Sequence, residues 1–344
     1  KKLIAFSISL AMTVVPVTPA AAAGAEQNTE GLQNAVLDLE FENSLEDSSG
    51  KGNNGTLSSG EAEYVDGVVG KGLKMNGSSY VNLGNSTDLQ PENLTLSFWI
   101  RPDSDMKGEE LISWNKNEWY TDGWYLSSEN DNTPLTLSVG PAKTNGQPYR
   151  VSVSGKRSEF LPTGEWTHIA VTYDKDSKEI CFYRNGVKCS TVTTYGISGE
   201  STGVLGSDAT MEKSIGYNGP KYKGAYLKAS LDEYQLYNDV ATPEEVIALY
   251  EESGQTFDRK AVAQADLDKI SIPETTQENL SLPTTGESGS VISWSSDNEA
   301  MVATDGTVVR PGVGEKDVTV TLTAEASYPV SYTHLRAHET EADL

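Results

Sequence analysis

The chain has 344 residues, and its 26 Lys and Arg residues are outnumbered by 50 Asp and Glu residues, which gives a formal net charge of −24 at pH 7. A polyanion of this size repels phosphate backbones and anionic lipid, so nucleic acid and membrane surfaces are disfavoured as partners and neutral polymers or cations are favoured. The length predicts two domains, and two cysteines are too few for a disulfide scaffold.

The first residues have the pattern of a secretory signal peptide. Lys1 and Lys2 precede an apolar run at residues 3–17, and small residues follow at 20–25. A positive start, a short apolar core and an A-x-A site are the parts of such a leader. We therefore expect residues 1–25 to be a signal peptide and the protein to be secreted or displayed on a bacterial cell surface. No later segment is apolar enough to insert into a membrane.

Residues 33–253 have the pattern of an all-β domain. Short alternating or apolar runs are separated by clusters of Gly, Asn, Asp, Ser and Pro, which is typical of an antiparallel sandwich. The runs lie at residues 36–41, 79–83, 94–100, 111–114, 124–126, 135–139, 150–153, 168–173, 180–183 and 231–236. One helix is predicted at the end, because Thr242 fits the N-cap, Pro243 the first helical position and Glu245 a capping box.

The two cysteines flank a hairpin signal. Cys181 and Cys189 lie on either side of Asn185 and Gly186. A two-residue turn places the cysteines on opposite faces, whereas a three-residue loop pairs them directly. The sequence leaves both turns open, and with them a Cys181–Cys189 disulfide.

A second, smaller unit is predicted after a linker at residues 254–266. A short polar helix at 261–267 overlaps the linker and leads into closely spaced runs. These runs, at 270–272, 280–282, 291–294, 301–303, 307–310 and 318–324, are typical of a small Ig-like sandwich. The unit covers residues 267–328, and its final sheet edge is expected to be unpaired.

The C-terminal residues do not resemble natural protein sequence. Residues 329–340 resemble the translation of an adapter used in DNA sequencing libraries. We therefore treat residues 329–344 as a non-native tail and the natural protein as cut near residue 328. His334 and His338 then take no part in the chemistry, and His168 is the remaining histidine.

Ordered motifs in both domains resemble known families. The segments 39–56, 67–77, 95–103, 165–174 and 231–238 resemble the LamG-like, concanavalin A-like jelly-roll modules of secreted bacterial proteins. The segments 282–286, 292–298 and 306–311 resemble bacterial Ig-like repeats. The resemblance implies an all-β chain, an antiparallel jelly-roll sandwich plus a truncated Ig-like β-sandwich. In similar architectures a glycoside hydrolase follows, frequently one acting on arabinan or xylan side chains.

The most tempting catalytic pattern is Asp38-x-Glu40-x-Glu42. Acidic residues two apart on a strand share a face and lie about 7 Å apart, near the spacing of glycosidase carboxylates. Glucanases built on this sandwich use an E-x-D-x-E strand, but here the order differs and the flanking motif is absent. His168 lies in an apolar strand, where a hydrogen-bonded structural histidine is expected. We therefore predict no catalytic residue.

Modules that resemble this one often bind a structural calcium near the first and last strands. Oxygen donors occupy the matching positions, namely Glu42, Asp47, Asn53 and Asp232. No EF-hand loop is present, so an alternative stays open in which these side chains cap turns and face water. Calcium is the only cofactor that we expect.

Sugar binding is predicted in an aromatic, polar stretch at residues 114–125. Aromatic rings stack on the C–H face of a sugar, while amides and acids bond its hydroxyls. The predicted carbohydrate-binding residues are Trp114, Trp119, Tyr120 and Asp122, with Tyr217 and Tyr222 from a second, Gly-rich stretch.

These features lead to three functional hypotheses. The first is a non-catalytic carbohydrate-binding module plus spacer, the monomeric N-terminal part of a truncated secreted glycoside hydrolase, which tethers the enzyme to an extracellular polysaccharide or oligosaccharide. The second is a cell-surface adhesin that binds protein or a host glycan. The third is hydrolase activity in the sandwich itself.

Overall fold

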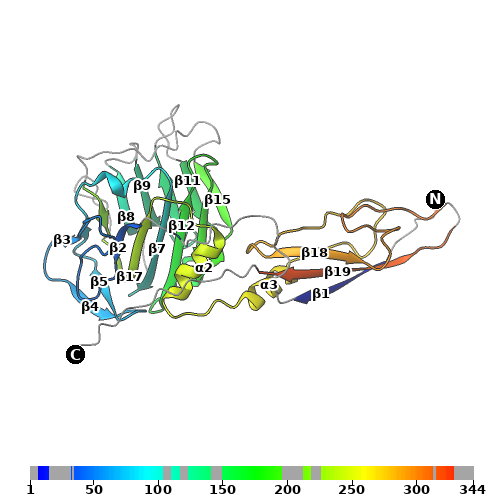
Figure 1. Ribbon diagram of the computed structural model, residues 1–344, viewed down its shortest axis with the longest axis horizontal. Helices are drawn as coiled ribbons and strands as arrows, with labels where there is room; N and C mark the ends of the chain where they lie inside the picture. Colours follow the sequence, from blue (N-terminus) through cyan, green and yellow to red (C-terminus); the bar gives the residue numbers. More distant parts are fainter. Residues whose placement is uncertain are drawn as a thin grey trace. The chain divides into compact units, whose positions relative to one another are not determined.

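The computed structural model describes residues 7–14, 32, 35–103, 110–116, 123–140, 149–195, 212–217, 226–312 and 315–328 (Figure 1). The chain forms two compact units: the first lies within residues 28–257, and the second combines residues 258–328 with the N-terminal residues 7–14. The division places helix α3 (Arg259–Asp268), which overlaps the predicted linker, in the second unit.

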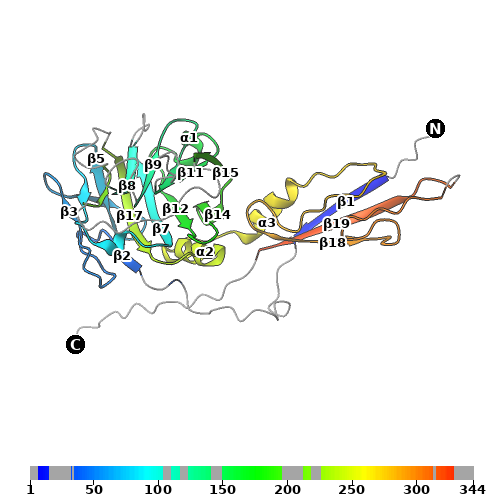
Figure 2. The same ribbon diagram turned by 90° about the horizontal axis from the view of Figure 1, so that it is seen from above.

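The first unit is an antiparallel sandwich of two sheets, which appear as two layers in Figure 2. We call them the β9 sheet and the β7 sheet. The β9 sheet has the order β15 (Thr191–Tyr195), β11 (Tyr149–Val153), β10 (Thr136–Val139), β9 (Gly123–Ser128), β8 (Glu110–Lys116), β16 (Ser214–Ile215), β6 (Val81–Asn82) and β3 (Thr56–Leu57). The β7 sheet has the order β14 (Val187–Lys188), β13 (Ile180–Arg184), β12 (Thr167–Tyr173), β7 (Leu94–Pro102), β17 (Lys228–Tyr237), β5 (Lys71–Asn76) and β4 (Glu63–Asp66), with β2 (Ala35–Leu39) also paired to β17. Short helical segments occur at η1 (Thr87–Leu89) and α1 (Arg157–Phe160).

Alternating side chains build one core between the two sheets. In β7, Leu94, Leu96 and Phe98 point inward, and from β9 Trp124 and Leu126 meet them in the same cluster. Both faces of β7 are nevertheless buried. The outer face of the β7 sheet therefore needs a cover of its own.

Helix α2 (Pro243–Glu252) provides that cover (Figure 2). Its Val246 packs with Ala170, Cys181 and Tyr183 on the outer side of β12 and β13. The predicted capping box is confirmed, because Thr242 Oγ1 accepts a hydrogen bond from the Glu245 N–H and the Glu245 carboxylate accepts one from the Thr242 N–H.

The hairpin between β13 and β14 decides the cysteine question. Asn185 and Gly186 have φ of 49° and 79°, and Arg184 pairs with Val187, so the turn has two residues. Cys181 therefore faces α2 while Cys189 packs against the main core, and both are free thiols. The disulfide alternative is wrong, because the turn puts the two side chains on opposite faces of the hairpin.

The second unit has fewer strands than the sequence predicts. Between residue 258 and the C-terminal end of the described chain, the structure has two strands, β18 (Val291–Ser296) and β19 (Thr319–Ser327), which pair antiparallel. The runs at 301–303 and 307–310 make one isolated bridge, Val302–Val308, and those at 270–272 and 280–282 form no strand. These short runs are bound through turns instead, as when the Leu280 N–H donates to the Gly306 carbonyl at 2.8 Å.

The edge of β19 is paired, contrary to prediction. Strand β1 (Ser7–Val14) lies parallel to it, from the pair Ser7–Thr319 to the pair Val14–Ala326. Part of the predicted leader is thus a strand here, and its removal as a signal peptide stays a prediction. No helix in the described ranges is long and apolar enough to cross a membrane.

Candidate functional site

The residues predicted to bind sugar divide into those that the structure describes and those that it does not. Trp119, Tyr120, Asp122 and Tyr222 lie outside the described residues. Trp114 lies in β8, where its backbone position is described. Tyr217, after β16, is described completely and is the starting point for the site.

Tyr217 is the centre of a cluster of three stacked rings, which we call the tyrosine cluster. Its ring lies 4.3 Å from that of Tyr226 at an interplanar angle of 9°, and 5.3 Å from that of Tyr80 at 24°. Tyr217 is buried, whereas Tyr80 and Tyr226 are half-buried and keep part of their surface in water. The cluster therefore offers flat apolar surface at the boundary of the fold.

Local hydrogen bonds hold the cluster in place. The Ser214 hydroxyl donates to the Tyr217 carbonyl at 2.7 Å, and the Leu227 N–H donates to the Gly216 carbonyl at 2.9 Å. Burial raises the phenol pKa of Tyr217, and the adjacent Tyr226 phenol adds to the shift. The phenol is therefore neutral at physiological pH and offers both a donor and an acceptor.

Strand register places the cluster beside one face of the β9 sheet. Directly paired residues of neighbouring strands lie on the same face. One row of paired residues crosses six strands, from Asn82 through Ser214, Trp114, Tyr125 and Ser138 to Arg150. Tyr80 is two positions before Asn82 and shares its face by alternation. A second row contains Ser127, Thr136 and Ser152.

Hydroxyl groups line this face, which we call the hydroxyl floor (Tyr125, Ser127, Thr136, Ser138 and Ser152). The Thr136 and Ser152 hydroxyls bond each other at 2.8 Å. Ser127 and Ser138 are fully buried, and neither hydroxyl has a partner among the described residues. At the end of the floor, Arg150 and Glu129 form an ion pair. The floor is thus polar, locally neutral and incompletely hydrogen-bonded.

The residues predicted to hold calcium serve two separate turns. Asp47 Oδ1 accepts the Asp38 and Ser49 N–H groups at 2.9 and 3.0 Å, and its Oδ2 accepts the Asn53 N–H at 2.8 Å. The Asn53 amide donates to the Val36 carbonyl at 2.7 Å. These two residues therefore organise the loop after β2, as the turn-capping alternative expects.

Glu42 and Asp232 meet at a different turn, between β4 and β5. Asp232 Oδ2 accepts the Val68 and Val69 N–H groups at 2.6 and 3.1 Å, and Glu42 Oε1 accepts the Lys71 N–H at 2.8 Å. A β-carbon at Gly67 or Gly70 would collide with one of these carboxylates, which explains the glycines at these two positions of the 67–77 segment.

This acidic turn has raised pKa values but no metal cage. Burial raises the pKa of Asp232 to about 6, and the nearby Glu42 charge adds to the shift. Burial also raises the pKa of Glu233 to about 8, with the charges of Asp232 and Asp38 as further causes. Within the described ranges, no group of three or more His, Cys, Asp or Glu side chains is arranged to hold a metal ion. Calcium binding therefore stays a prediction.

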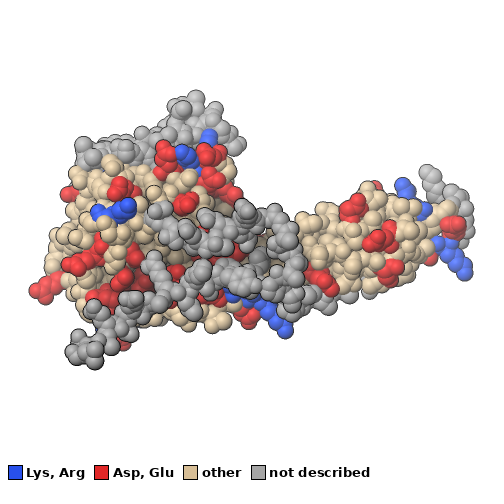
Figure 3. Space-filling view, in the orientation of Figure 1, with Lys and Arg blue, Asp and Glu red and all other residues tan. Residues whose placement is uncertain are grey.

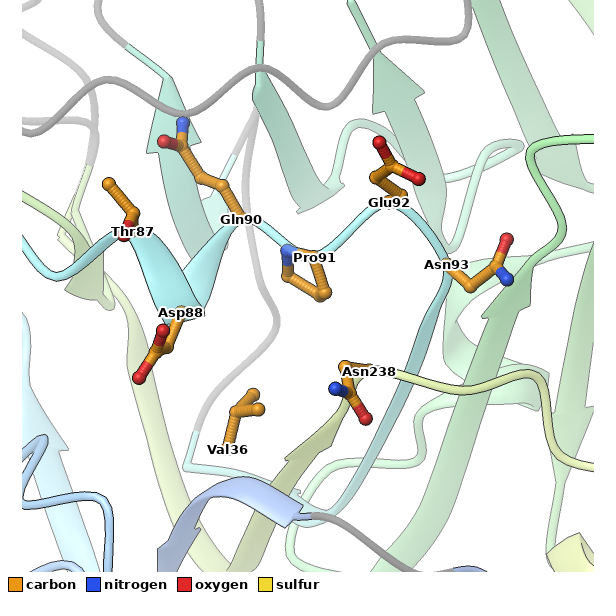
Figure 4. A pocket seen from close by; sticks show the side chains of 8 residues that line it. All are labelled: Val36, Thr87, Asp88, Gln90, Pro91, Glu92, Asn93 and Asn238. Carbon is orange, nitrogen blue, oxygen red and sulfur yellow. The ribbon is translucent and has the colours of Figure 1, made fainter.

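A separate cavity of about 400 Å³ lies beside the start of β7 (Figure 4). Its lining side chains are Val36, Thr87, Asp88, Gln90, Pro91, Glu92, Asn93 and Asn238. None of them is aromatic, and Glu92 is engaged by Lys175. The cavity offers no flat apolar face for a sugar ring, so the tyrosine cluster is the better candidate.

Comparison with known proteins identifies the first unit. Residues 75–247, half of the chain, match the family model of the concanavalin A-like lectin/glucanases superfamily. The chain belongs to this superfamily. Residues 260–333 match the model of the atrophied bacterial Ig domain, in agreement with the reduced number of strands in the second unit. The predicted arrangement of a jelly roll followed by an Ig-like domain is confirmed.

Solved structures with a similar fold include binding domains. One is domain 4 of AbnA, an extracellular GH43 arabinanase from Geobacillus stearothermophilus, in complex with arabinotriose: identity is 21%, the TM-score is 0.45, and the match covers 64% of this chain and 100% of that domain. Another is from botulinum neurotoxin type C, whose cell entry depends on two ganglioside molecules. Its identity is 16%, its TM-score is 0.48, and the match covers 64% of this chain and 51% of that chain. A third is the binding domain of Paraclostridial Mosquitocidal Protein 1. Its identity is 22%, its TM-score is 0.47, and the match covers 63% of this chain and 52% of that chain. The match spans about half of each toxin chain, and no curated protein sequence matches significantly.

Sequence reasoning missed most of the site in this concanavalin A-like jelly roll. Tyr80 stacks on Tyr217 because β6 and β16 pair, and Tyr226 stacks on it beside the hydrogen bond from the Leu227 N–H to the Gly216 carbonyl; no local pattern reveals either contact. A usable signal for the floor was present, since hydroxyl-bearing residues alternate at Ser127 in β9 and at Thr136 and Ser138 in β10. That period-two pattern predicts a polar face on strands that are otherwise apolar.

Proposed function

We propose that the jelly roll is a non-catalytic carbohydrate-binding module. The observation that carries this proposal is the tyrosine cluster, in which two half-exposed rings border a hydroxyl-lined sheet face. Aromatic rings stack on the apolar face of a sugar, and adjacent hydroxyl groups exchange hydrogen bonds with it. The cluster supplies the first kind of contact and its polar surroundings the second.

The carboxylates and the histidine have structural roles that support a non-catalytic module. Glu42 and Asp232 each accept backbone N–H groups in the turn between β4 and β5. His168 is buried beside Ser97, with 2.9 Å between His168 Nε2 and Ser97 Oγ, and burial lowers its pKa to about 3. It is therefore a neutral core side chain at physiological pH.

The wider role follows from the resemblance of the two domains. The module and its Ig-like spacer would be the monomeric N-terminal part of a secreted bacterial glycoside hydrolase with an arabinan- or xylan-type substrate. A module that binds weakly to a polymer raises the effective concentration of the tethered enzyme on that polymer. The net charge of −24 fits a neutral polysaccharide better than a polyanion.

The test is retention of the full chain on insoluble arabinan and xylan. Tyr226→Ala removes one stacking ring and is expected to weaken binding about 3- to 10-fold, as expected when a contact of about 0.5–1.5 kcal/mol is lost. Tyr226→Phe keeps the ring and should retain most of the affinity. Tyr64→Ala in β4, a half-buried tyrosine of the other sheet, is the matched control and should leave binding unchanged.

Three outcomes would count against the proposal. If neither polymer retains the wild-type chain, glycan tethering fails and a protein-binding adhesin becomes the better hypothesis. If binding is strong but Tyr226→Ala leaves it unchanged, the site lies elsewhere. If the chain releases reducing sugars from either polymer, the module is an enzyme.

A further inference from the structure

One edge of strand β19 is covered by a segment that the sequence predicts to be removed. Strand β1 pairs with β19 in parallel from the pair Ser7–Thr319 to the pair Val14–Ala326, and the two strands run side by side in Figure 2. Residues 7–14 lie inside the predicted leader, residues 1–25. Cleavage of the leader would therefore take this strand away and open the edge that it covers.

Backbone hydrogen bonds show which residues of β19 face that edge. The Thr321 carbonyl accepts the Asp297 N–H at 3.1 Å, and the Thr321 N–H donates to the Asp297 carboxylate at 2.8 Å, so Thr321 faces the β18 side. The backbone groups of neighbouring residues in a strand point to opposite edges. The residues that face β1, which we call the β19 edge, are therefore Val320, Leu322, Ala324 and Ala326. Without a partner strand they would present a row of unpaired donors and acceptors.

Helix α3 gives an added strand a second partner. It contacts both β1 and β19. Its Ala263 and Leu267 pack in one apolar cluster with Ala324 and Ala326 of the β19 edge. A strand at this edge is therefore bound through its backbone by β19 and contacts α3 as well. Addition of an extended peptide to an open sheet edge is a recurring mode of peptide recognition.

The sequence of β1 indicates what kind of segment fits the β19 edge. Residues 7–14 carry no charge, and an apolar residue stands at every second position. The register aligns these apolar positions, Ile8, Leu10, Met12 and Val14, with the four residues of the β19 edge. The field of a chain with a net charge of −24 also opposes the approach of an acidic segment. The edge therefore favours an uncharged strand with an alternating apolar pattern.

We propose that the β19 edge is a strand-binding site, which takes up an extended, uncharged segment of a second polypeptide once the predicted leader has been removed. The segment adds as a parallel strand in the register of β1. Backbone hydrogen bonds to the β19 edge supply its affinity, and its alternating side chains supply the specificity. The second unit is then a docking site for another protein, a role that does not depend on glycan binding by the first unit.

The test uses the full chain with prolines in β1, which opens the β19 edge without shortening the protein. Alternate residues of a strand face a given neighbour, so Leu10→Pro/Ala11→Pro removes at least one N–H that faces β19. The probe is a synthetic peptide of residues 7–14 with a lysine added at each end for solubility. It should bind the double variant, and it should bind the wild-type chain at least about 10-fold more weakly, because the tethered β1 competes for the same edge.

Amide exchange followed by NMR locates the bound peptide and contains its own control. Opening the edge should speed exchange at the Leu322 and Ala324 amides by at least about 10-fold, and the peptide should restore their protection. The Thr323 and Glu325 amides face the β18 side by alternation from Thr321. Their exchange should be the same with β1, with the prolines and with the peptide.

Two matched peptides test the pairing and its direction. A peptide with prolines at the positions of Leu10 and Ala11 lacks the same N–H groups and should not bind. A nitroxide label at the N-terminus of the probe should broaden NMR signals near Thr319 rather than near Ser327, because the register of β1 is parallel. Broadening near Ser327 would overturn the proposed register.

The proposal stays testable if the prolines unfold the second unit. The peptide should then refold it, which the indole N–H signal of Trp294 reports, because Trp294 Nε1 donates to the Pro283 carbonyl at 2.8 Å in the folded unit. A peptide that neither binds a folded variant nor refolds an unfolded one would overturn the proposal. So would equal binding to the wild type and the variant, or a dimer of the variant that excludes the peptide. None of these results bears on glycan binding by the first unit.

Discussion

The outer faces of the two jelly-roll sheets are both buried, yet they differ in how their polar groups are satisfied. On the β7 sheet, α2 covers Trp99 and His168, and the Tyr250 ring stacks on Trp99 at 5.6 Å. Ser97 and Thr95 find partners beneath this cover. On the β9 sheet, the hydroxyls of Ser127 and Ser138 have no hydrogen-bond partner in the part of the chain that the structure describes.

Under the proposed function, this difference means that burial alone does not separate a structural face from a binding face. A face that serves only folding tends to pair its hydroxyls, because an unpaired buried hydroxyl destabilises the native state. A face that serves a ligand keeps hydrogen-bonding capacity in reserve.

The largest effect is expected for Trp99→Ala under α2. Trp99 is 4% exposed and stacks on His168 and Tyr250. Losing a large buried ring costs about 3–5 kcal/mol. At about 2–4 °C per kcal/mol for a domain of this size, thermal unfolding should shift by about 10 °C. Calorimetry on the folded variant should show unchanged glycan affinity; a reduced affinity would mean that the β7 face takes part in binding.

The acidic residues in the middle of β17 should make stability depend on pH. Burial raises the pKa of Glu233 from 4.5 to about 8. Between these values the native state keeps a proton that the unfolded chain has released, so stability falls as pH rises through that window. Glu233→Gln removes the penalty and should raise the melting temperature by about 5 °C at pH 9 and hardly at all at pH 4. An equal shift at both pH values would contradict a titrating Glu233.

Calcium should have a smaller effect, at the turn between β4 and β5. A cation bound near Glu42 and Asp232 would offset the cost of ionising Asp232, whose pKa burial raises to about 6. At a tenfold excess over its dissociation constant, calcium would stabilise the chain by about 1.4 kcal/mol, or about 4 °C. Thermal scans at pH 8 with and without Ca²⁺ check this, with Glu42→Gln as the variant that should lose the response. Identical wild-type scans would remove calcium from the account.

The smallest expected effect is that of a reducing agent, which should be none. Cys181 and Cys189 are unbonded, and burial raises the pKa of the Cys189 thiol to about 12. An alkylating reagent should leave Cys189 unmodified in the native state and label both thiols in denaturant, as mass spectrometry would show. A drop in melting temperature on reduction would contradict the two-residue turn, because it would mean that Cys181 and Cys189 are bonded.

Local chemistry made much of the first unit predictable. The Asn185-Gly186 dipeptide favours a two-residue turn with positive φ, and Thr242 with Glu245 indicates the start of a helix. The second unit was over-predicted, because short apolar runs such as 280–282 satisfy a strand pattern and a turn-bound loop equally well. Backbone pairing with distant residues decides between them.

The candidate site was less predictable because its parts are distant in sequence. Tyr217 was found from its Gly-rich context, but Tyr80 joins it through the pairing of β6 with β16 and Tyr226 through the backbone bond between Leu227 and Gly216. Similarly, Glu42 approaches Asp232 because β2 pairs with β17, whereas Asp47 stays with its own loop. Composition and residue spacing cannot predict such contacts between residues that are distant in sequence.

The most direct measurement is an NMR titration of the full chain, selectively labelled on tyrosine, with a neutral oligosaccharide. Tyrosines occur on both outer faces, so one spectrum compares them. We predict that the ring signals of Tyr80, Tyr226 and Tyr125 shift together, while those of Tyr183, which packs against α2, and of Tyr250 in α2 stay in place. Shifts confined to Tyr183 and Tyr250, or no shifts at all, would contradict it.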